Sequence, residues 1–257
     1  YACRPRRIAS LLRPTLCMTA PRVSIVMPAF NEAEFLSTSV KSVSDGLRVR
    51  GAPFEVLVVE NGSTDETLAI AHQIASELPE VRVEHRDEAD YGRALRSGLL
   101  DAVGEVVVIF DVDYFDLDFL DAAVEQVLAV DGPAIVVGSK RGVGATDTRD
   151  PLRKFATGVF GTILRLVFGL RVSDTHGIKA IRRAVVVPYA QVCTFGQDLF
   201  DTELILRVER AGLRTAEIPV EVRELRPARS SFLSRVPRTL RGLCRLRWAL
   251  WKAARAR

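Results

Sequence analysis

Short runs of consecutive apolar residues alternate with longer amphipathic segments along most of this chain. The apolar runs predict strands over Val23–Met27, Phe54–Val59, Val81–His85, Val106–Phe110 and Ala134–Val137. The segments between them have helical periodicity over Ala33–Arg50, Glu66–Leu78, the stretch from Gly92 to Val103, and about Asp118–Ala129. Because strands alternate with helices at this spacing, we predict an α/β fold with a mostly parallel, Rossmann-like central sheet flanked by helices.

The second half of the chain is less regular. Its pattern predicts an amphipathic segment at Pro151–Phe168, a helix over residues 197–211 and a late strand at Arg214–Val222. From Pro237 onward, helical spacing places leucines and a tryptophan on one arc and arginines opposite, which indicates a basic amphipathic helix. Such a helix is typical of a membrane-surface element, and the alternative is a helix docked on the main domain with a solvated basic face.

One junction concentrates candidate chemistry. The run Val106–Phe110 leads directly into Asp111-Val112-Asp113, at the end of a strand expected to be buried on both faces. Ligands of open α/β sheets bind outside the carboxyl ends of such strands, and two carboxylates at this spacing suit a hard cation shared with substrate phosphates. The alternative is a solvated turn in which Asp111, Asp113, Asp116 and Asp118 only cap the next helix.

Charge is strongly segregated along the 257 residues. Residues 1–18 have four basic and no acidic groups, residues 226–257 have ten basic and none acidic, and residues 19–225 have 22 basic against 32 acidic. We therefore expect a leader at 1–18 outside the fold, one catalytic domain at 19–225, and a basic segment at 226–257 that meets an anionic surface. The acidic body and the lack of a binding signature argue against nucleic acid.

The cysteines and the hydropathy of the chain predict the cellular compartment of the protein. The four cysteines form no Cys-x-x-Cys pair, so we expect neither a zinc site nor a disulfide framework, and a reducing cytoplasm fits best. The longest apolar candidate, Ala156–Val172, is interrupted by Arg165 and is too short for a membrane span. These features predict a cytoplasmic protein held peripherally at the inner face of the plasma membrane.

Six motifs occur in order at the predicted strand ends and loops. They are Pro28-Ala29-Phe30-Asn31-Glu32, the stretch from Val58 to Asp65, Gly92-Arg93-Ala94, Asp111-Val112-Asp113, Gly138-Ser139-Lys140, and Asp174 with Gly177. Over roughly residues 22–231 this set resembles glycosyltransferase family 2, and within it most resembles the dolichyl- or polyprenyl-phosphate sugar synthases. The resemblance implies a GT-A fold, a nucleotide-sugar donor, a divalent cation (Mg²⁺ or Mn²⁺) and inversion at the anomeric carbon.

The resemblance also implies roles for individual residues. Its donor-binding positions fall on Pro28, Phe30, Glu32, Asp90, Asp111, Val112, Asp113 and Lys140, with Glu60 or Asn61 reading the base. The family usually has paired aspartates where this chain has Glu60-Asn61, so guanine and uracil both stay open. Asp111 and Asp113 match the metal motif. Phe115 stands where related synthases often have a third polar ligand, so water, phosphate oxygens or Asp116 would complete the coordination.

The acceptor side favours a phosphate. A phosphate monoester is mostly ionised at neutral pH and attacks without a strong base, provided that cations hold it. The candidate cations and hydroxyl follow the predicted loop and the last strand, namely Arg149, Arg153, Arg226, Arg229 and Ser230. Each of these arginines could instead be an ordinary surface charge. The segment Phe155–Leu170 corresponds to the family's bilayer-facing helices, and the alternative is a buried core helix.

These observations predict a transferase that moves one sugar from a GDP- or UDP-sugar to polyprenyl phosphate, with a membrane protein as a further partner. A first alternative is a family 2 enzyme with a saccharide or other hydroxyl acceptor, for which Asp201 or Glu203 would serve as catalytic base. A second alternative is a nucleotide-sugar-binding module without turnover, which the apolar residue at Phe115 would favour.

Overall fold

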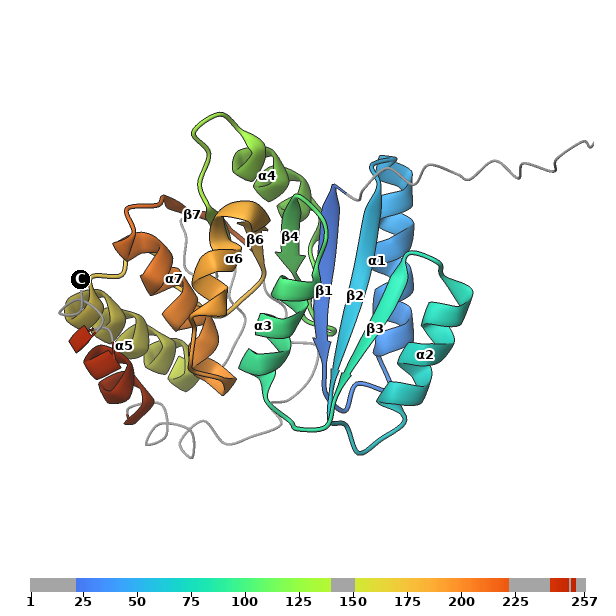
Figure 1. The fold of residues 1–257 in the computed structure, drawn as a ribbon, viewed down its shortest axis with the longest axis horizontal. Coiled ribbons are helices and arrows are strands. Elements are labelled where there is room, and N and C mark those ends of the chain that lie inside the picture. Colours follow the sequence, from blue (N-terminus) through green and yellow to red (C-terminus); the bar gives the residue numbers. More distant parts are fainter. Residues whose placement is uncertain (1–21, 140–150, 222–240, 250, 253–257) are drawn as a thin grey trace, which may run out of the picture.

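The computed structural model describes residues 22–139, 151–221, 241–249 and 251–252, with the side chains of 151–158, 160 and 198 left out of the description. Seven strands form one sheet (Figure 1), namely β1 (Val23–Ala29), β2 (Phe54–Asn61), β3 (Val81–Arg86), β4 (Val106–Ile109), β5 (Ile135–Ser139), β6 (Lys179–Arg182) and β7 (Thr215–Pro219). The helices are α1 (Leu36–Arg50), α2 (Thr67–Glu77), α3 (Tyr91–Asp101), α4 (Leu117–Leu128), α5 (Pro151–Phe168), α6 (Arg183–Gln191) and α7 (Phe200–Arg210), with a 3-10 turn η1 at Gln197–Leu199.

The strand order is β3-β2-β1-β4-β6-β5-β7, and β6 alone runs against its neighbours. The parallel strands therefore end at one edge of the sheet, where ligands of open α/β folds bind. Because β6 is reversed, it begins at that same edge, and its first residue, Lys179, is paired in register with Ile109 of β4. A residue that starts a strand thus joins those that end the other strands.

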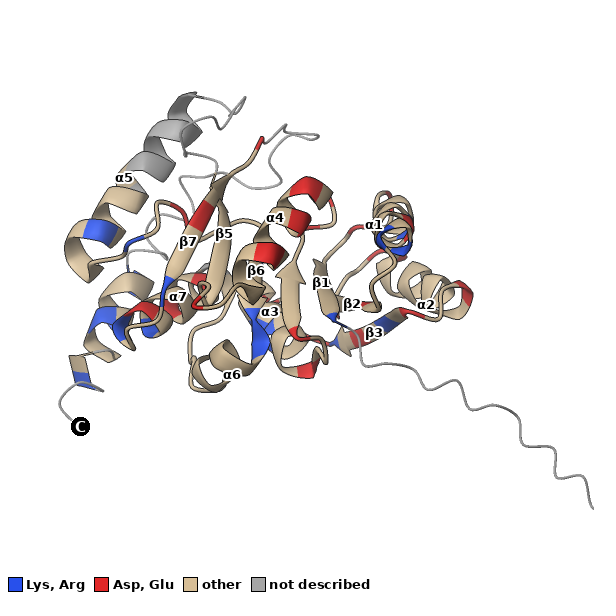
Figure 2. Ribbon diagram, turned by 90° about the horizontal axis from the view of Figure 1, so that it is seen from above, with Lys and Arg blue, Asp and Glu red and all other residues tan. Residues whose placement is uncertain are grey.

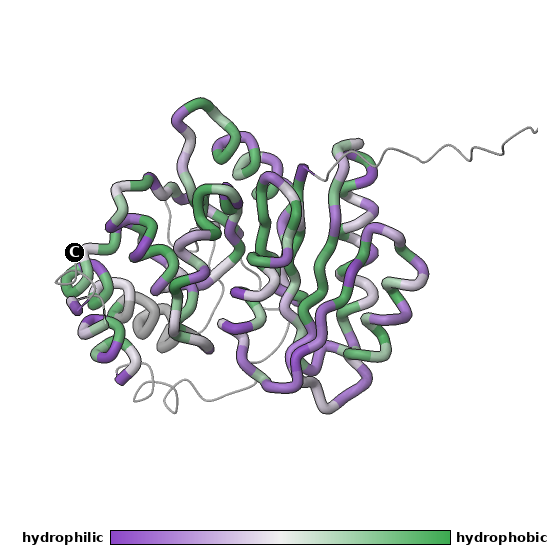
Figure 3. Tube along the Cα trace, viewed as in Figure 1, coloured by the Kyte–Doolittle hydropathy of each residue, from purple (hydrophilic) through white to green (hydrophobic). Residues whose placement is uncertain are grey.

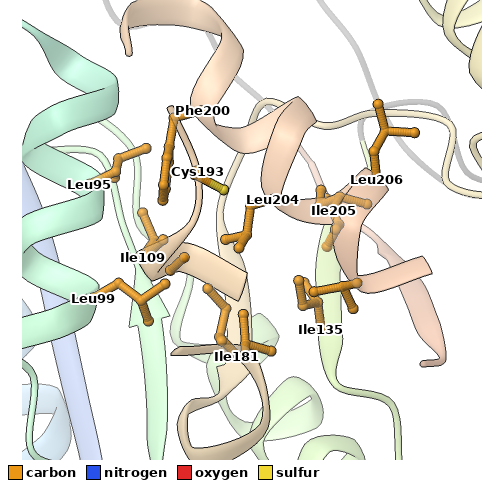
Figure 4. Packing of buried hydrophobic residues seen from close by; sticks show 14 of the residues in the cluster. Leu95, Leu99, Ile109, Ile135, Ile181, Cys193, Phe200, Leu204, Ile205 and Leu206 are labelled. Carbon is orange, nitrogen blue, oxygen red and sulfur yellow. The ribbon is translucent and has the colours of Figure 1, made fainter. Parts of the chain in front are cut away.

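Two apolar layers enclose the sheet. One contains side chains from α1, α2 and α4, and the other contains side chains from α3, α6 and α7 with the end of α5. Seen from above, these helices lie on opposite sides of the strands (Figure 2). The inner strands are apolar along their length (Figure 3), as is expected of strands covered on both faces. In the second layer, Leu95 and Leu99 of α3 pack near Ile109, Phe200 and Leu204 (Figure 4).

The structure confirms most predicted elements within a few residues but adds two. Neither β6 nor α6 is expected from the pattern, because β6 has four residues and α6 contains Pro188. The predicted helix at 197–211 divides into η1 and α7. The predicted boundaries at residues 18 and 225 lie in parts of the chain outside the described residues, so the three-part division stays a prediction.

The predicted basic helix is present at residues 241–249 and 251–252, here called the C-terminal helix. Its Leu243 and Leu246 are buried in the second apolar layer, together with Leu164 and Phe168 of α5. Part of its surface is therefore docked on the main domain, as in the alternative interpretation. Among the helices that the structure describes, none is both long and apolar enough to cross a bilayer.

Candidate active site

The first two strand ends are joined to each other by reciprocal hydrogen bonds. The backbone N–H of Asn31 donates to Ser63 Oγ (2.9 Å), and the N–H of Glu32 donates to Thr67 Oγ1 (2.7 Å). In return, Asn31 Oδ1 accepts from the N–H of Thr64 (2.8 Å). Asn31 has a left-handed backbone (φ 55°), a conformation that asparagine tolerates better than most residues. The candidate donor residues Pro28, Phe30 and Glu32 thus belong to one braced corner, with the Phe30 ring exposed.

Glu60, one of the two candidates for reading the base, is fully buried and engaged within the chain. Its Oε1 accepts from the N–H of Ser63 (2.6 Å), and its Oε2 lies 2.5 Å from Nδ1 of His85. Burial alone would raise the pKa of Glu60, but the hydrogen bonds from Ser63 and His85 outweigh it and lower that pKa. The hydrogen bond to Glu60 correspondingly raises the pKa of the exposed His85. Glu60 therefore anchors the turn after β2.

Asn61 and Asp90 are linked, and Asp90 has a further structural task. Asn61 Oδ1 accepts from the backbone N–H of Asp90 (2.9 Å). Oδ1 of Asp90 caps α3 by accepting from the N–H of Arg93 (2.9 Å) and also accepts from the N–H of Gln197 (2.6 Å). A Cβ on Gly196 would lie 2.4 Å from Asp90 Oδ2, so a side chain at this position would displace the Asp90 carboxylate. Asp90 thus holds the start of η1 against the start of α3.

The Asp111-Val112-Asp113 turn closes on itself. Asp111 and Tyr114 exchange two backbone hydrogen bonds (3.1 and 3.2 Å), and Ser39 Oγ of α1 donates to the carbonyl of Val112 (2.6 Å). Asp111 and Asp113 are partly exposed, whereas Val112 is buried. The turn therefore presents its two carboxylates beside the end of β4 while its apolar residue points into the core.

Tyr91 connects α3 to this turn. Its hydroxyl donates to Asp111 Oδ1 (3.0 Å). Burial, followed by the negative charges of Asp111, Asp201 and Asp113, raises the pKa of Tyr91 well above its ordinary value. The phenol is therefore protonated at neutral pH and acts as a donor. Three carboxylates from two separate elements are close enough to influence one hydroxyl.

Asp116 and Phe115 have structural roles. Asp116 Oδ1 caps α4 by accepting from the N–H groups of Asp118 (3.0 Å) and Phe119 (2.9 Å). The ring of Phe115 packs near Phe110, with ring centroids 6.3 Å apart. The capping alternative for this acidic stretch thus holds for Asp116, while Asp111 and Asp113 lie on the turn before it.

The donor set at the turn fits a divalent cation. Carboxylate oxygens are the ligands that Mg²⁺ and Mn²⁺ prefer. Within the described residues, no group of three or more His, Cys, Asp or Glu could hold a metal ion. Asp111 and Asp113 are therefore the carboxylates that would hold the ion, and Mg²⁺ is characteristically held by one or two carboxylates plus substrate phosphates and water.

Asp201 and Glu203, the candidate bases, are both buried and ion-paired. Asp201 is 3% exposed, and its Oδ1 accepts from Nζ of Lys179 (2.9 Å), which is itself 0% exposed. Glu203 is also fully buried. Its Oε1 accepts from Arg207 (2.7 Å) and its Oε2 from the N–H groups of Thr194 and Phe195 (2.9 Å each). Each carboxylate is thus buried and engaged by a cation of the chain itself.

The acceptor-side candidates are not placed. Arg149, Arg226, Arg229 and Ser230 lie outside the described residues, as does the donor-binding candidate Lys140, and Arg153 lies in α5 with its side chain outside the description. Ser139, the last described residue before Lys140 in the sequence, has its Oγ 2.9 Å from Ser173 Oγ, and Glu217 Oε1 accepts from the N–H of Ser173 (2.6 Å). Four residues absent from the sequence-based list therefore shape the site: Tyr91, Lys179, His85 and Glu217.

Comparison with known families and curated proteins gives consistent matches. The sequence profile described as "Glycosyl transferase family 2" matches residues 24–187. Glycosyltransferase AglD of Haloferax volcanii is 31% identical over 204 residues, which are 77% of this chain and 32% of that protein. A dolichyl-phosphate beta-glucosyltransferase of Trichomonas vaginalis is 28% identical over 216 residues, which are 79% of this chain and 66% of that protein. The chain thus spans about a third of the first relative and just under two thirds of the second.

Comparison with solved structures supports the fold. Glucosyl-3-phosphoglycerate synthase from Mycobacterium tuberculosis, in complex with Mn²⁺ and UDP-glucose, superimposes with a TM-score of 0.65 at 24% identity, covering 89% of this chain and 79% of the other. At this identity the likeness concerns the fold alone, and it confirms the predicted GT-A architecture with its mostly parallel sheet.

Proposed function

This chain belongs to glycosyltransferase family 2, and from that premise we propose that it transfers one sugar from a GDP- or UDP-sugar to a polyprenyl phosphate at the cytoplasmic face of a membrane. The dolichyl-phosphate glucosyltransferase relative supports the lipid phosphate as acceptor. Membership of a glycosyltransferase family supports an enzyme over the binding-only alternative.

The burial and ion pairing of Asp201 and Glu203 are the observation that favours a phosphate acceptor over a hydroxyl acceptor. A hydroxyl acceptor must lose a proton to a base within hydrogen-bonding reach. Both carboxylates here are buried, one against Lys179 and the other against Arg207 and two backbone N–H groups. A phosphate acceptor has no such need, since its second pKa is about 6 and it is mostly ionised at neutral pH.

The donor is expected along the edge formed by β1, β2 and β4. Phe30 would contact the nucleoside, and Asn61 would offer its amide nitrogen, because its Oδ1 is held by the N–H of Asp90. Asp111 and Asp113 would hold the diphosphate end, with a Mg²⁺ or Mn²⁺ ion that neutralises charge on the departing nucleotide. The acceptor phosphate attacks the anomeric carbon from the opposite face, so the configuration inverts. Positioning and charge stabilisation supply the catalysis.

An exposed apolar surface supports delivery of a lipid. Leu166 of α5 is 83% exposed, and Val167 beside it accepts a hydrogen bond through its carbonyl from Arg247 of the C-terminal helix. That helix exposes Trp248 and Trp251, and Arg247 adds positive charge. Exposed aromatic and aliphatic groups next to arginines suit an anionic bilayer surface, which the lipid acceptor requires.

The test is a transfer assay with paired acceptors. Purified protein, Mn²⁺ and radiolabelled GDP- or UDP-sugars are incubated with anionic vesicles containing either a polyprenyl phosphate or the matching polyprenol, and the lipid is extracted. We expect label in the lipid fraction with the phosphate and at least tenfold less with the alcohol. Equal labelling of both acceptors, or transfer to a saccharide hydroxyl alone, would refute the proposal and support the hydroxyl-acceptor alternative.

A further inference from the structure

We propose that Tyr91 is a positioning residue for Asp111, so that one phenol hydroxyl sets the affinity of the turn after β4 for its divalent cation. This inference rests on the proposed function, because it takes the cation and the nucleotide as ligands of that turn. The carrying observation is the 3.0 Å hydrogen bond from the Tyr91 hydroxyl to Asp111 Oδ1.

Tyr91 is held at both of its ends. It is the first residue of α3, whose cap is the carboxylate of Asp90. Its ring packs against the apolar layer beneath the sheet. The neighbouring Gly92 lies so close to Gln197 that a Cβ there would approach the Gln197 backbone to 2.7 Å. The backbone that carries the phenol is therefore fixed from two directions, and the hydroxyl has a defined position.

A fixed donor restricts the Asp111 carboxylate. A terminal carboxylate group rotates broadly about its last bond unless a partner holds one oxygen. The phenol holds Oδ1 at one position, which restricts rotation of the Asp111 carboxylate on the closed turn that also carries Asp113. Groups that orient metal-binding side chains commonly change metal affinity or activity by 10- to 100-fold when they are removed.

The group that orients the Asp111 carboxylate lies among other charged side chains. Asp201 lies near enough to act on the same hydroxyl, and its charge is compensated by Lys179. The phenol adds a hydrogen-bond donor to this acidic neighbourhood without adding a positive charge. It can therefore hold Asp111 without neutralising the carboxylate that a cation needs.

The experiment compares Tyr91→Phe with wild type and with Tyr189→Phe, a matched loss of a hydroxyl on α6. Electron paramagnetic resonance of free Mn²⁺ measures its retention by the protein in the presence of UDP or GDP. We expect Tyr91→Phe to weaken nucleotide-dependent Mn²⁺ binding by roughly 10- to 100-fold. The Tyr189→Phe control should change it less than about twofold.

Nucleotide affinity with and without EDTA separates positioning from a general structural effect. If the phenol acts through the cation, Tyr91→Phe lowers nucleotide affinity when the metal is present, and this difference from wild type disappears when the metal is chelated. A loss of the same size in EDTA, or an Mn²⁺ affinity within about twofold of wild type, would overturn the inference and leave the proposed function standing. If the wild-type protein fails to retain Mn²⁺ in the presence of UDP and also in the presence of GDP, the proposed function and the inference are both refuted.

Discussion

The buried ion pair between Lys179 and Asp201 can be tested by its effect on the free energy of unfolding. The two side chains are 0% and 3% exposed, and their charged atoms are 2.9 Å apart. Replacing Lys179 with Met leaves the Asp201 carboxylate buried without its cation, which typically costs about 3–5 kcal/mol. For a domain of this size that corresponds to a fall in melting temperature of roughly 6–20 °C. The double variant K179M/D201L removes both charges and should recover to within about 1 kcal/mol of wild type.

The assay is urea unfolding followed by circular dichroism, with Lys41→Met as the matched control. Lys41 pairs with Glu77 at 3.1 Å, but both side chains are nearly half exposed, so its loss should cost less than about 1 kcal/mol. A Lys179→Met cost as small as that of Lys41→Met would refute the buried pair. So would a double variant whose destabilisation equals the sum of its two single changes, since the two residues would then act independently.

The remaining predictions concern the site, pH and the membrane surface. Asp113→Ala should reduce transfer roughly a thousandfold with an unchanged circular dichroism spectrum, and activity within tenfold of wild type would contradict the metal assignment. Because Glu60 raises the pKa of His85, the stabilisation from this charge is complete below about pH 6.5 and is lost as pH rises through the raised value. The difference in urea midpoint between wild type and His85→Gln should therefore shrink from pH 6 to pH 9, and a constant or growing difference would exclude the charged pair. Replacing Trp248 and Trp251 with Ser should lower sedimentation with anionic vesicles severalfold, and unchanged sedimentation would remove the C-terminal helix from the membrane surface.

The strand ends that frame the site are predictable from the sequence because the buried parallel strands are continuous apolar runs. Each run from Val23, Phe54 and Val106 leads into polar residues, and the structure places these stretches at one edge. The reversed strand β6 is not predictable in this way. Its four residues begin with Lys179, whose partner Asp201 is 22 positions later and is brought close only by folding.

Carboxylates at strand ends are harder to assign than strands. Glu60, Asp90 and Asp116 are acidic residues at the expected edge, and the structure uses all three to accept backbone N–H groups. Accepting an N–H group and binding a ligand make the same chemical demand, so residue type and position alone do not separate the two roles. The contribution of Tyr91 is equally hidden, because a tyrosine at the start of a helix carries no signal about the residue that its hydroxyl meets.

The reciprocal hydrogen bonds between the turns after β1 and β2 affect the rate at which a nucleotide binds there and the entropy that its binding costs. Asn31, Glu32, Ser63, Thr64 and Thr67 hold one another through hydrogen bonds within the chain. When a binding surface is preorganised, association does not have to immobilise its side chains. That immobilisation costs about 0.5–1.5 kcal/mol for each side chain. Loosening this brace, for instance with Ser63→Gly, would slow productive capture of the nucleoside even though no atom that touches it had changed.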